Sequence, residues 1–143
     1  MIRPSRETVY AALFAKLQSV AGLTTVSRRL QNVQDVQPEN FPAAFQLQGE
    51  QQNKYTGNTP TIYTWKCDWL LYAYSADPTV APSTALNVLI DAAVAVLAPV
   101  FGKQTLGGLV EYCAIDGSIQ VFEGVLDNRA VAVIPIAILL PGF

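Results

Sequence analysis

Histidine is absent from this 143-residue chain. Its absence removes the commonest general base and the commonest transition-metal ligand, and it rules out a Ser-His-Asp triad. The two cysteines, Cys67 and Cys113, lack the close pairing of a zinc site and the density of a disulfide scaffold. Both lie in apolar runs, so we expect buried free thiols from a chain that folds in a reducing cytosol. We therefore expect no metal, no cofactor and no enzymatic activity.

Charged residues are also scarce, at 14% of the chain, and the nine basic and eleven acidic side chains give a net charge of -2. This composition gives no basic footprint for nucleic acid. Hydrophobic residues make up 51% of the chain. A domain of this length buries roughly 70% of its unfolded surface, and monomers rarely expose large apolar patches. The composition therefore favours a subunit that covers part of its surface with other chains.

Uninterrupted apolar runs of membrane-spanning length are missing. The run 130–140 is shorter than the roughly 20 residues that a spanning helix needs, and the run 84–101 is broken by Asn87, Asp91 and Pro99. The N-terminal residues are polar and charged, unlike a targeting segment. We expect one soluble domain over residues 1–143, with no membrane partner.

Two helices are predicted from apolar spacing. The first spans residues 5–21, where one face carries Val9, Tyr10, Leu13, Phe14, Leu17 and Val20. The second spans residues 82–97, with Pro82 in its first turn and Pro99 beyond its end.

The rest of the chain predicts strands at 24–30, 44–51, 61–75 and 129–140, with loops at 31–42 and 52–60. The segment 109–122 predicts either two short strands, 109–116 and 118–122, or one strand bent at Gly117. The strand 61–75 has one apolar face, and its other face begins polar and becomes aromatic, so we expect one end of that second face to be covered. Pro135 in the last strand is expected at a sheet edge or a bulge. Strands that follow one another through short turns favour an α+β fold, with a mostly antiparallel β-sheet and two helices packed on one face.

Several segments resemble tail terminator or tail completion proteins of long-tailed bacteriophages and prophages. The resemblance extends from about Arg6 to Pro141, and it rests on TVSRRL (25–30), FPAAFQLQGEQ (41–51), ALNVLIDAAVAVLAP (85–99), QTLGGLVEYCAIDG (104–117) and EGVLDNRAVAVIPIAILL (123–140). These segments are packing and turn patterns without a catalytic signature.

The resemblance implies a structural virion protein at the head-proximal end of the tail, made in the host cytoplasm. Its copies would form a hexameric ring that stops growth of the tail tube and gives the head connector a docking surface. Its partners would be copies of itself, the tube protein and a head connector or neck protein. DNA would pass through without specific binding.

Eight residues are candidates for the subunit or tube interface: Arg28, Arg29, Glu50, Lys54, Tyr55, Tyr72, Tyr74 and Arg129. Arg28 and Arg29 point to opposite faces of a strand, so only one of them can reach a given partner; a solvated strand face is the simpler interpretation. The polar segment 48–60 is expected either to order against the tube or a neighbour, or to be a flexible hairpin tip. Exposed tyrosines suit protein interfaces, although core packing is the alternative for the aromatic run.

Three other functions stay open. A head-closure or neck adaptor also forms rings but binds the portal rather than the tube. A small-molecule binding domain would need a closed apolar pocket and no strong self-association. An enzyme would need an activity that one carboxylate substitution abolishes.

Overall fold

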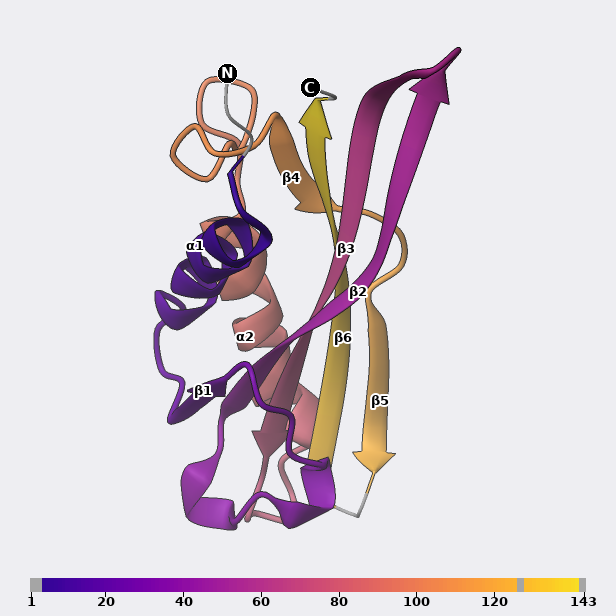
Figure 1. The fold of residues 1–143 in the computed structure, drawn as a ribbon. Coiled ribbons are helices and arrows are strands. Elements are labelled where there is room, and N and C mark those ends of the chain that lie inside the picture. Colours follow the sequence, from indigo (N-terminus) through magenta and orange to yellow (C-terminus); the bar gives the residue numbers. More distant parts are fainter. Residues whose placement is uncertain (1–3, 126–127, 142–143) are drawn as a thin grey trace.

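The computed structural model describes residues 4–125 and 128–141, and it confirms an α+β fold (Figure 1). Six strands form one sheet in the order β1-β2-β3-β6-β4, and β5 also pairs with β6. All the pairings are antiparallel except that of β1 with β2. The elements are α1 (Arg6–Gln18), β1 (Thr25–Ser27), β2 (Ala43–Thr56), β3 (Thr59–Tyr74), α2 (Pro82–Val96), β4 (Tyr112–Ile115), β5 (Gln120–Val125) and β6 (Arg129–Pro141).

Both helices lie on one face of the sheet, as Figure 1 shows. The predicted apolar face of β3 is buried beneath them, with Trp65, Cys67, Trp69, Leu71 and Ala73 each at most 1% exposed. Alternate residues of β6, from Ala130 to Leu140, complete this core. Ser5 begins α1 by accepting a hydrogen bond from the Thr8 N–H at 3.1 Å. The helix ends at Gln18, three residues earlier than predicted.

The opposite face of the sheet is covered at one end, as its aromatic residues predicted. Residues 31–42 form two short 3₁₀ turns, Val33–Asp35 and Pro38–Asn40, and fold over this face. Val36 and Phe45 are buried there with Tyr72 in a second, smaller cluster. The chain thus has a large core under the helices and a small core under this segment.

The prediction of a loop at 52–60 is wrong. Residues 43–56 and 59–74 form one long antiparallel hairpin, which closes with Thr56 opposite Thr59. Gly57 takes a positive φ of 63° in the two-residue turn, a conformation that suits glycine in hairpin turns. The hairpin projects past the rest of the sheet at the upper right of Figure 1. We call residues 51–64 of this hairpin the arm.

Pro135 lies within a central strand, which differs from the expected edge or bulge. β6 pairs with β3 on one side and with both β4 and β5 on the other. On that second side, Pro135 faces the gap between β4, which ends at Ile115, and β5, which starts at Gln120. Its carbonyl accepts the Asp116 N–H at 3.0 Å. The missing proline N–H therefore costs no hydrogen bond between strands, because no strand runs opposite it there.

Candidate assembly surfaces

The tip of the arm is exposed to solvent. Every residue from Gln52 to Thr59 is exposed, and Tyr55 keeps 55% of its surface open to solvent. Lys54 and Tyr55, two of the candidate interface residues, lie on it. Strand pairing holds the arm as an extended hairpin, so the side chains of Lys54 and Tyr55 lie away from the core.

Polar contacts from α1 fix the base of the arm. Arg6 donates to the Gln51 Oε1 at 2.7 Å, and its guanidinium lies 5.3 Å from the Trp65 ring centre. Arg28 contacts the Glu7 carboxylate at 2.6 Å and donates to the Gln48 Oε1 at 3.1 Å. These contacts join the first turn of α1 to the strand that leads into the arm.

Arg28 and Arg29 differ in what they contact. The hydrogen bond from Arg28 holds the pKa of Glu7 below its ordinary value, so Arg28 already has a partner within its own chain. Arg29 is exposed, and its backbone N–H is bonded to the Ser27 hydroxyl at 2.9 Å. Glu50 is exposed near the base of the arm. Arg29 and Glu50 are therefore open to contact with another chain.

Tyr72 lies in the small core, and the half-buried Tyr74 and Arg129 contact Phe41, which packs against that core. Tyr72 is 3% exposed, donates to the Gln31 carbonyl at 2.8 Å, and has its pKa raised by burial. The Arg129 guanidinium lies 5.4 Å from the Phe41 ring centre and 5.5 Å from that of Tyr74, and the two rings stack on each other. Tyr72 is thus covered by its own chain, and the other two make contacts that attach residues 31–42 to the sheet.

Exposed apolar side chains also gather at two places that the sequence did not indicate. Val100 and Phe101 lie in a tight turn closed by backbone hydrogen bonds between Val100 and Lys103. Phe101 has a positive φ of 53° and a fully exposed ring. A left-handed conformation is uncommon for a residue other than glycine. Phe101 thus combines an uncommon backbone conformation with an aromatic ring that its own subunit leaves in water.

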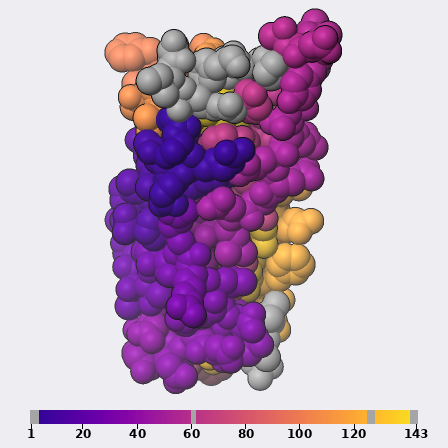
Figure 2. Space-filling model, in the orientation of Figure 1, coloured from indigo at the N-terminus to yellow at the C-terminus, as the bar shows by residue number. Residues whose placement is uncertain are grey.

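A second exposed apolar site is β5. All residues from Gln120 to Gly124 are exposed, including Val121 at 45% and Phe122 at 47%. Opposite them on β6, Ala132 belongs to the large core and Val131 packs against the small one. Val121 and Phe122 therefore lie on opposite faces of the sheet at its margin, and β5 reaches the surface at the right of Figure 2.

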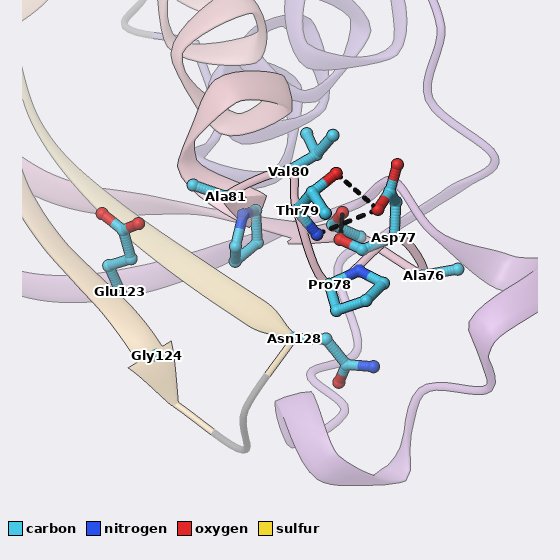
Figure 3. A pocket seen from close by; sticks show the side chains of 11 residues that line it. Ala76, Asp77, Pro78, Thr79, Val80, Ala81, Glu123, Gly124 and Asn128 are labelled. Atoms are coloured by element: carbon cyan, nitrogen blue, oxygen red, sulfur yellow. Dashed lines mark hydrogen bonds between the residues drawn. The ribbon is translucent and has the colours of Figure 1, made fainter.

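A hollow of about 570 Å³ lies where β3 leads into α2. Its rim is formed by residues 75–82 with Glu123, Gly124 and Asn128 (Figure 3). The Asp77 carboxylate accepts hydrogen bonds from the Thr79 N–H at 2.9 Å and the Thr79 hydroxyl at 2.7 Å, which lower its pKa. These bonds shape the turn before α2, so Asp77 has a structural role that needs no ligand.

Chemistry-bearing side chains are few in the described residues. No three His, Cys, Asp or Glu side chains gather there as metal ligands. Cys67 and Cys113 are buried and unbonded to each other, as expected; burial raises the pKa of both thiols, that of Cys113 to about 11. No helix of residues 4–125 or 128–141 is long and apolar enough to cross a membrane.

Comparisons with known proteins found no family model that matches the chain and no curated protein that matches it.

Proposed function

We propose that this chain is a structural subunit of a phage virion. Its copies assemble into a hexameric ring that ends the tail tube and provides the surface to which the head docks. The resemblance of five segments to tail terminator proteins supplies this identity, and the surface of the subunit supports the assembly.

The observation that carries the proposal is the separation of the exposed apolar residues. Val100 and Phe101 lie beyond the end of α2, Val121 and Phe122 lie on β5, and Tyr55 lies on the arm. A ring needs a heterologous interface, in which one patch on a subunit meets a different patch on its neighbour. A subunit with several separate patches can contact two neighbours in the ring and still present a further patch along the ring axis.

The first test is the mass of the purified chain by light scattering over a range of concentrations, with negative-stain images of the same sample. The proposal expects closed rings with six times the 15.5 kDa chain mass. A strict monomer at every concentration, alone and with tail tubes, would contradict it. Rings that bind the portal but not the tube would instead identify a neck adaptor.

Charge reversal at the paired arginines tests the interface assignment. Arg29→Glu is the cleaner variant, because the Arg28 side chain is already bound to Glu7 and Gln48. We expect Arg29→Glu to weaken ring formation and to leave the unfolding midpoint unchanged. Arg28→Glu, measured beside it, also breaks an ion pair within the subunit. Normal assembly by both variants would remove the two arginines from the interface.

A further inference from the structure

The described sheet has an open strand edge on each side, one on β5 and one on β2, and the backbone hydrogen bonds show which groups these edges expose. On β6, the carbonyls of Pro135 and Leu139 accept the N–H groups of Asp116 and Glu111. Odd-numbered residues of β6 therefore direct their backbone groups toward β4 and β5, since the direction alternates along a strand.

The same alternation identifies the outward groups of β5. Gln120 and Phe122 lie opposite the odd-numbered Val133 and Val131, so both bond to β6. The N–H and C=O groups of Val121 and Glu123 consequently point away from the sheet. No described strand pairs with this side of β5.

The second open edge belongs to β2. β1 covers this edge only at Ala43–Phe45, and the Pro42 carbonyl there accepts the N–H groups of Thr24 and Thr25. Farther along, a bulge between Gln48 and Gln51 shifts the register, so the backbone groups of Gln51 and Asn53 point outward from the arm.

We propose that successive subunits of the ring are joined by strand pairing, in which β5 of one copy adds to the open edge of the arm of the next copy. This inference rests on the proposed function, because it names the contact that builds the ring. Pairing two different edges gives a heterologous contact, whereas pairing β5 with itself would give an isologous dimer.

The side chains of the two edges complement each other. β5 carries Glu123, and Lys54 is the only charged residue from Gln51 to Thr64, so the two edges carry opposite charge. These two side chains attract each other only across the sheet, because Glu123 pairs with Ala130 of the large core whereas Lys54 pairs with Ile62 on the opposite face. Phe122 lies on the face of the sheet that bears the small core, opposite Val131. The arm has a hollow of about 440 Å³ lined by Ile62 and Thr64 with residues 52–54. The hollow is large enough for the phenyl ring of Phe122, which is half exposed in the isolated subunit.

Cross-linking tests the pairing directly. The double variant Val121→Cys/Asn53→Cys places one thiol on each edge, and the native thiols do not compete because Cys67 and Cys113 are 1% and 2% exposed. With a short bismaleimide, we expect a ladder of covalent oligomers that ends at the closed ring. The control Val88→Cys/Asn53→Cys uses a residue of α2 that is 67% exposed and lies outside the proposed contact; it should give no ladder.

A proline variant tests the backbone bonds separately. Val121→Pro removes an outward N–H and no bond to β6, whereas Val121→Ala shortens the same side chain and keeps the N–H. We expect Val121→Pro to raise the concentration for half assembly roughly tenfold relative to Val121→Ala. A circular-dichroism spectrum equal to that of the parent shows that the Val121→Pro subunit still folds. If it does not fold, the cross-linking result alone tests the strand pairing.

The outcomes separate this inference from the proposed function. Rings that form while the double variant gives no ladder would overturn the strand pairing and leave the ring in place. Dimers alone from the single variant Val121→Cys would show β5 paired with itself, and would also overturn it. A protein that stays monomeric would overturn both the pairing and the ring.

Discussion

Arg129→Met distinguishes a residue that stabilises the subunit from one that joins subunits. The Arg129 guanidinium lies 5.4 Å and 5.5 Å from the ring centres of Phe41 and Tyr74. One of its terminal N–H groups donates to the Val36 carbonyl at 3.4 Å. Methionine keeps much of the apolar stem and removes the charge, so the variant isolates the contribution of the cation.

The expected loss follows from these contacts. A cation over an aromatic ring contributes about 0.5–1 kcal/mol at a partly exposed site, and Arg129 has two such rings. The 3.4 Å hydrogen bond is long and adds little, and the buried Arg129 Nε has no hydrogen-bond partner, which offsets part of the gain. We expect Arg129→Met to lower the free energy of unfolding by about 0.5–1.5 kcal/mol. A chain of this size should then melt about 2–5 °C lower.

Urea unfolding followed by circular dichroism measures this loss. All variants are compared at one protein concentration, because assembly raises the apparent stability of the folded subunit. Arg129→Lys is the matched control: it keeps the charge and loses the planar stacking on the rings, so its stability should fall between those of the other two proteins. An unchanged unfolding midpoint with loss of rings would refute the structural role and return Arg129 to the interface.

Three further predictions concern the subunit itself. Gln46→Met removes the acceptor of the buried Trp69 indole N–H, which lies 3.0 Å from Gln46 Oε1. The variant should lower the free energy of unfolding, measured in urea, by about 2 kcal/mol. The loss should be smaller in a Trp69→Phe background, and an equal loss in both backgrounds would contradict the hydrogen bond. Asp77 has a lowered pKa in the folded state, so its contribution to stability is present above the ordinary aspartate pKa and declines as the pH falls through the folded value. Asp77→Asn should therefore show a shallower fall of the melting temperature in acid, and an identical pH profile would exclude the contribution. Cys67 and Cys113 should resist iodoacetamide in the folded protein and react after unfolding, as mass spectrometry would show; rapid labelling of the native protein would contradict their burial.

The alternation in β3 predicted the main core because one of its faces is apolar throughout. Trp65, Trp69 and Leu71 are all buried, as their two-residue spacing indicated. The same strand predicted a covered end on its other face, and residues 31–42 provide that cover. Period-two patterns are informative wherever the two faces of a strand meet different surroundings.

The sequence pattern does not predict the strands of the arm, because their two faces have the same surroundings. Both of its faces are in solvent around Gln52–Thr59, so its residues carry no hydrophobic alternation. The local signal was the pair Gly57-Asn58, since a two-residue turn of this kind commonly closes a hairpin. The central position of Pro135 could not be read locally either, because it depends on β4 and β5 sharing one side of β6.

The candidate residues divide in the same way. Arg29, Glu50, Lys54 and Tyr55 lie on exposed surface, as a contact site requires. Tyr72 packs beneath a segment more than thirty residues earlier in the chain, a contact that depends on the tertiary fold. Phe101, Val121 and Phe122 were overlooked because isolated apolar residues in a sequence are usually buried. Only the folded chain shows that these three remain outside.

We have proposed that this protein caps the end of a tail tube. Phage tail tubes are incubated with the purified protein, which carries a gold-labelled tag, and are then imaged by electron microscopy. We expect label at one end of each tube, in a ring, and no further growth of that end when tube protein is added. Unlabelled ends, or tubes that continue to lengthen from both ends in the presence of folded protein, would contradict it.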